Sequence, residues 1–475
     1  MKRRTWIFAI AGAIGIAVLV GVGPRVWEST VTLARHRPAP PALETLPGEA
    51  QDRIYAADRT AQSLWRSRDG MADLARLYQA NGFFEEALAC YEGLRAVEPQ
   101  NARWWHLPAV ILAGLGRLEE AEPLFRRAAE RAPDYLPAHV RAADVLLKAN
   151  RVEEAQRIYD DVLARFGEQP YALLGLARVA IARDDWAAAE TLLQRAIAVD
   201  ANFVGGLALL ATVHKQLGRH AEADRIAARV NRREFVDLKD PWADELLEDC
   251  YDPYYLSVAA NVANYRRDPA LAKRHLERAA TMASNPAPYL RQLGQLGFMT
   301  RNYAEAEQHL AQAVALAPTD AQAWTIWVNV LLGAGKRAEA YRVLLDGLAH
   351  CPDSGALRYV HGYLLNEDGQ VARAIEELRL AKPLRSTQAD VYVELARAYF
   401  KAGETEAGIA ELKEALSVQP DHPYALVVVA RYTIDHGDAV DAREWVRRIR
   451  QQTRTAPEDV ELVLKEFQQK FGRSP

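Results

Sequence analysis

The sequence predicts an all-α fold in which pairs of helices repeat along the chain. The main observation is a pattern of small, aromatic and turn residues that recurs every 34 residues from about residue 68 onward. In its first copy, Met71, Leu74, Ala75 and Tyr78 are spaced at i, i+3, i+4 and i+7, which places them on one face of a helix. Gly82 then supplies a break, because glycine tolerates the left-handed backbone that ends a helix.

The second half of each copy predicts a second helix, which in the first copy covers about residues 84–97. Ala87, Tyr91 and Leu94 share one face and are expected to pack against the first helix. Alanine suits this position because two helix backbones approach closely there and a larger side chain would separate them. Pro99 ends the helix, since proline cannot continue one.

The small residues of both helices stay in register through the chain, and all but Val328 are alanine or glycine. They are Ala75, Ala109, Ala143, Ala177, Ala211, Ala260, Gly294, Val328, Gly362, Ala396 and Ala430 in the first helices, and Ala87, Ala121, Ala155, Ala189, Ala223, Ala272, Ala306, Ala340, Ala374, Gly408 and Ala442 in the second. This pattern resembles the tetratricopeptide repeat, a helix–turn–helix unit. The resemblance implies a right-handed α-solenoid of about eleven helix pairs.

The copies fall into two runs, with the first five at 68–237 and the sixth to eleventh at 253–456. A cap helix is predicted at 50–67, and residues 457–475 predict a C-terminal capping helix that covers the apolar face of the last repeat. Residues 25–49 are rich in proline and predict an extended, semi-rigid linker.

Residues 1–24 predict a transmembrane signal-anchor. Lys2, Arg3 and Arg4 precede the uncharged residues 5–22, which as a helix would be about 27 Å long, close to the roughly 30 Å of a bilayer core. Basic residues stay on the cytoplasmic side, so we expect a single-pass protein of the inner membrane with periplasmic repeats. A cleaved signal peptide is the alternative, although Pro24 should hinder cleavage. Reversed topology would give a cytoplasm-facing adaptor.

The two runs are separated by an acidic insertion at 238–252. Its acidic residues, with the one just before it, are Asp237, Asp240, Asp244, Glu245, Glu248, Asp249 and Asp252. We interpret it as a short amphipathic helix that packs on the solenoid through Trp242, Leu246 and Leu247 and turns an acidic face to water. The alternatives are a partner-docking insertion and a hinge between two half-solenoids. Since the insertion has no EF-hand pattern, no calcium site is expected.

No known catalytic or metal-binding motif is found in the sequence, and its eleven histidines and three cysteines are scattered. We therefore expect no enzyme activity, cofactor or metal. The formal net charge is −4 even with the basic N-terminal cluster included, which argues against nucleic-acid binding.

The resemblance implies that the first helices line a concave groove that binds a protein or peptide. Asparagine can hold a peptide backbone, and tyrosine and arginine are frequent at binding hot spots. The predicted groove residues are Arg76, Asp144, Arg178, Asn261, Asn264, Tyr265, Asn329, Tyr359, Tyr363, Asn366, Arg397 and Arg431.

The predicted function is that of a membrane-anchored scaffold or adaptor in cell-envelope assembly, secretion or maturation. An alternative, which rests on analogy between repeat proteins alone, is a regulator or carrier subunit of a polysaccharide export system.

Overall fold

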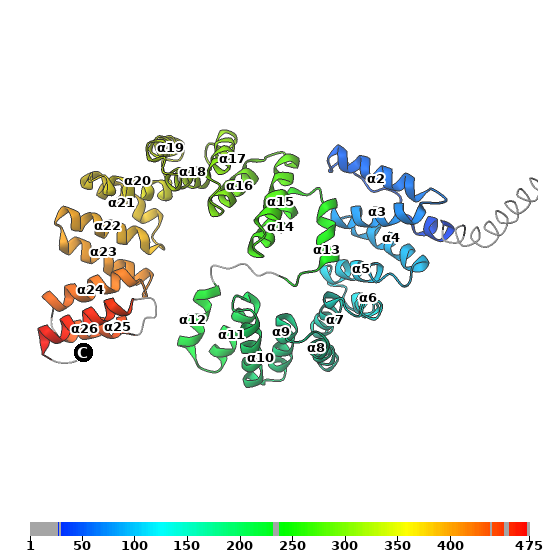
Figure 1. Ribbon diagram of the computed structural model, residues 1–475, viewed down its shortest axis with the longest axis horizontal. Coiled ribbons are helices and arrows are strands. Elements are labelled where there is room, and N and C mark those ends of the chain that lie inside the picture. Colours follow the sequence, from blue (N-terminus) through cyan, green and yellow to red (C-terminus); the bar gives the residue numbers. More distant parts are fainter. Residues whose placement is uncertain (1–26, 28–29, 231–236, 438, 451–455, 473–475) are drawn as a thin grey trace, which may run out of the picture. The chain divides into compact units, whose positions relative to one another are not determined.

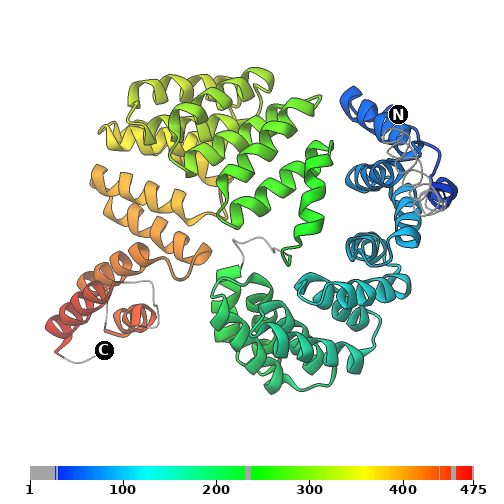
Figure 2. The same ribbon diagram turned by 45° about the vertical axis from the view of Figure 1, so that its right-hand side comes forward.

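The computed structural model describes residues 27, 30–230, 237–437, 439–450 and 456–472, and these contain helices and no strand. The chain divides into two compact units, Met1–Met282 and Ala283–Pro475, called here the N-terminal unit and the C-terminal unit. In each of them, helices that follow one another in the chain lie side by side (Figures 1 and 2).

The N-terminal unit consists of α2 followed by five helix pairs, a short linking segment and a sixth pair. The helices are α2 Gly48–Ala61, α3 Ser67–Ala80, α4 Phe84–Val97, α5 Arg103–Gly114, α6 Leu118–Arg131, α7 Leu136–Lys148, α8 Val152–Phe166, α9 Pro170–Ala182, α10 Trp186–Val199, α11 Val204–Gln216, α12 His220–Val230, α13 Pro241–Asp244, the 3₁₀-helix η1 Glu245–Asp249, α14 Pro253–Tyr265 and α15 Pro269–Met282.

The C-terminal unit consists of five helix pairs and a final helix. Its elements are α16 Ala287–Met299, α17 Tyr303–Leu316, α18 Ala321–Gly333, α19 Arg337–His350, α20 Gly355–Glu367, α21 Val371–Leu384, α22 Ala389–Ala402, α23 Thr405–Val418, α24 Pro423–His436, α25 Ala439–Arg450 and α26 Pro457–Phe471. The prediction of an all-α repeat of helix pairs is therefore confirmed over the described residues.

Small residues allow the two helices of a pair to approach closely. Ala121 and Ala340, on the second helices of pairs in different units, have no exposed surface. Gly294 lies so close to Leu310 that an added Cβ would approach the leucine Cγ to 2.4 Å. The turn between the helices needs a left-handed residue, and Gly82 provides it with a φ of 85°.

The first and last helices cover the ends of the repeats. In the N-terminal unit, Gly70 of α3 lies against the backbone of α2 at Ala61, where no side chain could fit. In the C-terminal unit, α26 packs on α24 and α25 and buries Val463 and Phe467 completely. Each terminal helix thus removes apolar repeat surface from water.

The region predicted as an extended linker packs more closely than expected. Residues 30–36 are helical, and Leu33 and Leu43 are buried in the core formed with α2, α3 and α4. Their apolar side chains gain more from burial than an extended spacer would allow.

The predicted transmembrane segment at 1–24 lies outside the described residues. None of the helices that are described combines the length and apolar character needed to cross a membrane.

Candidate functional site

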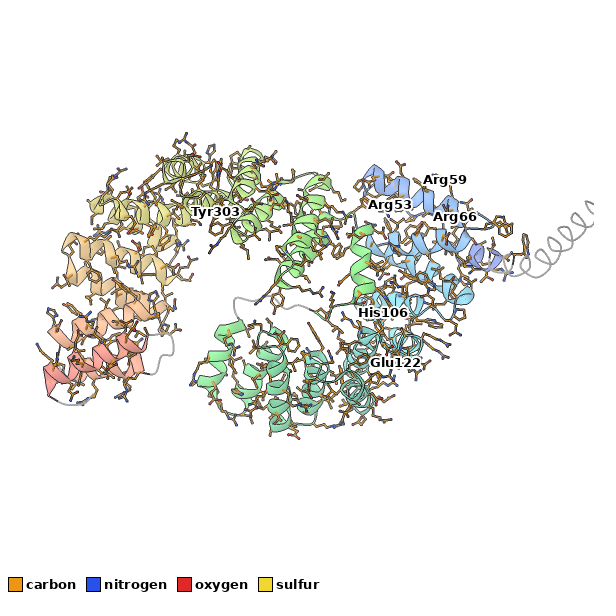
Figure 3. All side chains as sticks on the ribbon, viewed as in Figure 1. Arg53, Arg59, Arg66, His106, Glu122 and Tyr303 are labelled. Carbon is orange, nitrogen blue, oxygen red and sulfur yellow. The ribbon has the colours of Figure 1, made fainter. Side chains whose placement is uncertain are left out.

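Residues 237–252, called here the internal segment, contain α13 and η1 and lie against the first repeats of the N-terminal unit. α13 contacts α5, and η1 contacts α3. The surface that receives the segment, called here the N-terminal inner face, is formed by Arg53, Arg76, Asn81, Arg103, His106, Tyr135 and Arg141. Figure 3 labels Arg53 and His106, which bind opposite ends of the segment.

At the C-terminal end of the segment, the carboxylate of Asp249 is buried between two arginines. Arg53 of α2 donates to one of its oxygens and Arg76 of α3 donates to the other. Asn81, directly after α3, holds the main chain at the same place. Its amide nitrogen donates to the Asp249 carbonyl at 2.8 Å, and its oxygen accepts from the Tyr251 N–H at 2.8 Å. One asparagine thus satisfies a main-chain carbonyl and a main-chain N–H where η1 ends.

At the N-terminal end, the carboxylate of Asp240 is buried against α5. Its two oxygens lie 2.6 Å from His106 Nε2 and 2.6 Å from the Tyr135 hydroxyl, which donates to it. Burial alone would raise the pKa of Asp240, but the hydrogen bonds from His106 and Tyr135 outweigh burial and hold the pKa below its ordinary value. Asp240 also caps α13 by accepting from the Ala243 N–H at 3.3 Å.

Trp242 lies in an aromatic site between these two ends. Its ring stacks on Tyr135 with centroids 3.5 Å apart and packs edge-on against His106 at 5.5 Å. The guanidinium of Arg103 lies 5.5 Å from the centre of the tryptophan ring and also forms a bidentate pair with Glu245. A cation above an indole face is attractive, so Arg103 binds both the aromatic and the acidic part of the segment.

The other acidic residues of the segment are paired as well. Asp237 binds Arg141, Asp244 binds Arg266, Glu248 binds Arg274, and Asp252 caps the start of α14. Asp237, Glu245 and Glu248 are exposed, as the interpretation of an acidic face turned to water requires, but Asp240 and Asp249 depart from it. Asp240 and Asp249 are buried, because the surrounding helices carry the cations and donors that a buried carboxylate needs.

In the C-terminal unit, the predicted groove residues Asn329 and Tyr363 lie on the first helices α18 and α20. Asn329 is half-buried and Tyr363 is exposed. Over the part of the chain that the structure describes, neither side chain forms a hydrogen bond with the protein. These two side chains can therefore bind a partner without the loss of an internal hydrogen bond.

Three more predicted residues of this unit are used within the fold. Arg397 lies 4.8 Å from the Tyr424 ring and pairs with Glu394 at 3.4 Å. Asn366 is buried and donates to the other oxygen of Glu394 at 2.7 Å. Arg431 pairs with Glu466 of α26 at 2.8 Å.

Tyr359, the remaining predicted residue of the C-terminal unit, stacks with a cation. The Arg385 guanidinium lies 4.8 Å from the centre of its ring. Burial raises the pKa of Tyr359 to about 12, so its hydroxyl stays protonated.

The remaining predicted residues belong to the N-terminal unit and lie apart from the internal segment's main contacts. Asp144 accepts from the Tyr159 hydroxyl at 2.6 Å, and burial raises the pKa of its carboxyl. Tyr265 donates to the Asn202 carbonyl at 2.9 Å. Arg178 and Asn261 are exposed, and Asn264 is half-buried.

Of the predicted groove residues, only Arg76 belongs to the N-terminal inner face defined above. The other residues of this face were not predicted as groove residues; they are Arg53, Asn81, Arg103, His106, Tyr135 and Arg141. A sequence signal did exist, because the first helices α3, α5 and α7 carry Arg76, Arg103 and Arg141, whose charge is opposite to that of the acidic insertion. Nothing local in the sequence shows that the two meet.

An apolar hollow of about 480 Å³ lies beside the internal segment. Its walls come from Ile111 of α5 and Leu115 directly after it, from Leu246 and Leu247 of the segment, and from Val258 of α14. Within the described ranges, no three histidine, cysteine or acidic side chains are grouped to hold a metal ion.

Comparison with known proteins gives distant relatives. The chain is 26% identical over 110 residues to "DnaJ homolog subfamily C member 3" of Gallus gallus, covering 23% of this chain and 22% of the relative. It is 24% identical over 360 residues to "TPR repeat-containing thioredoxin TTL4" of Arabidopsis thaliana, covering 73% of this chain and 44% of the relative. The chain thus spans less than half the length of these curated relatives.

Among solved structures, yeast Tom70 aligns with a TM-score of 0.38 and 13% identity, over 85% of this chain and 96% of that one. MamA from Desulfovibrio magneticus RS-1 aligns with a TM-score of 0.31 and 19% identity, over 35% of this chain and 95% of that one.

Models of the tetratricopeptide repeat match the chain in both units. The matched residues are 72–135, 112–179, 153–204, 204–229 and 393–457. Over these residues, the helix pairs described above are the units that the models represent. The chain is therefore similar to tetratricopeptide repeats over these residues, which are less than half of its length.

Proposed function

We propose that this protein is a membrane-anchored scaffold or adaptor that binds a segment of another protein on the first helices of its repeats. The observation that carries the proposal is the internal segment itself. The N-terminal inner face holds an irregular stretch of polypeptide by its main chain, at Asn81, and by the carboxylate of Asp249, which lies between Arg53 and Arg76. A surface that binds one stretch of polypeptide in this way has the chemistry to bind others.

The C-terminal unit offers the corresponding surface for a partner. Asn329 and Tyr363 occupy equivalent positions on α18 and α20, next to buried core residues such as Val328 and Leu364. A tyrosine exposed in this setting provides a rigid contact area, and an asparagine provides a donor and an acceptor for a peptide backbone.

The proposed location is the inner membrane, with residues 1–24 as anchor and the repeats in the periplasm. Lys2, Arg3 and Arg4 support this orientation. In this place the scaffold would act in envelope assembly, secretion or maturation. Alkaline phosphatase fused after Pro475 should be active in cells, and a fusion that is expressed but inactive would exclude the periplasmic location.

Binding is tested by crosslinking in intact membranes. Tyr363 is replaced by benzoylphenylalanine, which keeps an aromatic ring at this position, and irradiation is followed by mass spectrometry. The matched control places the same crosslinker at Glu376, which is exposed on the second helix α21. We expect a protein adduct from position 363 and none from position 376. Equal adducts from both positions would contradict the proposed surface, and synthase or pore subunits among the adducts would favour a role in polysaccharide export.

A further inference from the structure

The N-terminal inner face recognises the internal segment in the manner of a peptide ligand. The segment has little regular structure, since α13 has four residues and η1 has five. Many of its main-chain groups are therefore bonded by side chains from other elements. Asn81 holds the main chain at Asp249 and Tyr251, the Tyr135 hydroxyl accepts from the Trp242 N–H at 3.0 Å, and Arg278 of α15 donates to the Leu247 carbonyl at 2.7 Å.

The side-chain contacts specify what kind of segment fits. Two carboxylates enter buried positions, Asp240 between His106 and Tyr135 and Asp249 between Arg53 and Arg76. Between them, the Trp242 ring lies in the aromatic site of Tyr135, His106 and Arg103. Charge-assisted hydrogen bonds at fixed positions and one stacked ring together select an acidic segment that carries a tryptophan.

We infer that the N-terminal inner face is a binding site for an acidic, tryptophan-containing segment of a partner protein, and that residues 237–252 occupy it as an internal ligand. A partner segment binds by displacing them. Because the internal segment belongs to the same chain, its effective concentration at the face is about millimolar or higher, and a free segment of the same sequence competes poorly. The repeats thus keep this site closed until a better ligand arrives.

The inference rests on the proposed function only in that the repeats bind polypeptide. Its test uses a peptide of this chain's own sequence, so the result does not depend on a partner being found in membranes. A failed crosslink at position 363 and a failed peptide experiment are therefore separate outcomes.

The experiment measures binding of a fluorescent peptide of residues 237–252, with serine in place of Cys250, to the purified full chain. In the chain, Asp240→Asn with Asp249→Asn weakens the internal ligand and leaves the inner face unchanged. We expect this double variant to bind the peptide at least about tenfold more tightly than the unmodified chain does, because the internal competitor has lost two charged anchors. The matched control is Asp353→Asn with Glu376→Gln, two exposed acidic residues of the C-terminal unit, and it should leave peptide affinity unchanged.

Specificity is tested from both sides of the contact. Adding Arg53→Ala and Arg76→Ala to the double variant should abolish peptide binding, and a peptide with Trp242→Ala should bind at least about tenfold more weakly. A folded double variant with the peptide affinity of the unmodified chain would overturn the inference, as would equal binding of the peptide with and without tryptophan.

Hydrogen exchange provides a second measurement on the unmodified chain, in case the double variant does not fold. Peptide at a concentration above the effective concentration of the internal segment should speed exchange at the Trp242 and Tyr251 amides, whose acceptors lie on the inner face, and leave the amides of α5 protected. If exchange at these two amides stays unchanged in excess peptide, the segment is a permanent part of the core and the inference is wrong.

Discussion

The two units carry the same repeat, but the first helices of their pairs are used differently. In the N-terminal unit, Arg76 on α3 binds Asp249 of the internal segment, and the surface around it is filled by the chain itself. In the C-terminal unit, Tyr363 occupies the equivalent position on α20 and is exposed. The difference shows that the repeat determines which positions face inward, while the residues at those positions decide whether the surface is filled or free.

Two kinds of interaction stabilise the units, namely close packing of small residues and polar contacts of buried carboxylates. In both units, the pairs are held by close contacts between small residues such as Ala121 and Ala340, which have no exposed surface. Both units also bury carboxylates beside cations, as Glu394 does in the C-terminal unit, and in the N-terminal unit such carboxylates form a polar layer that holds the internal segment. Such a layer is costly when one partner is missing, because the remaining group is buried without compensation. The first three predictions examine these two contributions.

The largest expected effect is the loss of the Asp240 carboxylate. Its side chain is 5% exposed and that of its partner His106 is not exposed at all. Asp240→Ala should therefore destabilise the N-terminal unit by roughly 3–5 kcal/mol, the usual cost of breaking a buried pair. Denaturation monitored by hydrogen exchange should show this loss of stability in α5 and unchanged stability in α22. Asp353→Ala is the exposed control, and a loss below about 1 kcal/mol for Asp240→Ala would mean that the pair is not a buried anchor.

A smaller effect is expected from overpacking, and it should be the same in both units. Ala121→Leu and Ala340→Leu each place a larger side chain where two helices meet, which should cost about 1–3 kcal/mol. Glu119→Gln, a change on the exposed face of α6, should cost almost nothing. Thermal melts of the three variants provide the measurement. A large difference between the two leucine variants would show that the units do not share one packing rule.

Acid should weaken the polar layer less than removal of the carboxylate does, because a protonated Asp240 can still form a hydrogen bond. The pKa of Asp240 is lower in the folded chain than its ordinary value of 3.8. The ionised Asp240 carboxylate therefore contributes its full stabilisation of the folded chain above that value, and this stabilisation is lost as the pH falls through the lower folded pKa. Exchange protection of α5 should stay constant between about pH 7 and 5 and decline below about pH 4. Asp240→Asn should lack the part of the decline that comes from protonation of Asp240. If the variant shows the same acid profile as the unmodified chain, Asp240 is not the group that causes the decline.

Much of the fold could be predicted from the sequence, because helix pairing depends on local spacing. The second helix of the first pair was predicted at 84–97, and the structure has α4 at Phe84–Val97. The small residues in register mark the close contacts that a repeat needs. The burial of Leu33 and Leu43 could not be predicted in the same way, since a proline-rich stretch has no periodicity that shows which side chains pack.

The N-terminal inner face was harder to predict because its contacts join distant parts of the chain. Arg53 belongs to the cap helix, outside the repeat pattern, and it binds Asp249 almost two hundred residues later. Asn366 shows the opposite error, since it follows Tyr363 by one helical turn but is 1% exposed and holds Glu394. Repeat position indicates the side of a helix that faces inward, but not whether a neighbouring side chain covers it.

The smallest expected change in stability concerns the free surface of the C-terminal unit, and it tests that surface most directly. Tyr363→Ala with Asn329→Ala removes two side chains that form no hydrogen bond within the described chain. The free energy of unfolding should therefore fall by less than about 0.5 kcal/mol per residue, and the melting temperature should hardly change. Arg397 is unsuitable for this test, because its removal would also break the contacts with Tyr424 and Glu394.

If Tyr363 and Asn329 bind a partner, the double variant should lose about 1 kcal/mol or more of binding free energy for each truncated contact, although its fold is unchanged. The measurement is recovery of the crosslinked partner from membranes, beside a circular-dichroism melt. Glu376→Ala, on the outer face of α21, serves as the control and should keep both the melt and the partner. Undiminished recovery with the double variant would place the partner elsewhere. The N-terminal inner face, opened by Asp240→Asn with Asp249→Asn, would then be the first surface to examine, because it already binds an acidic segment through contacts that a partner could replace.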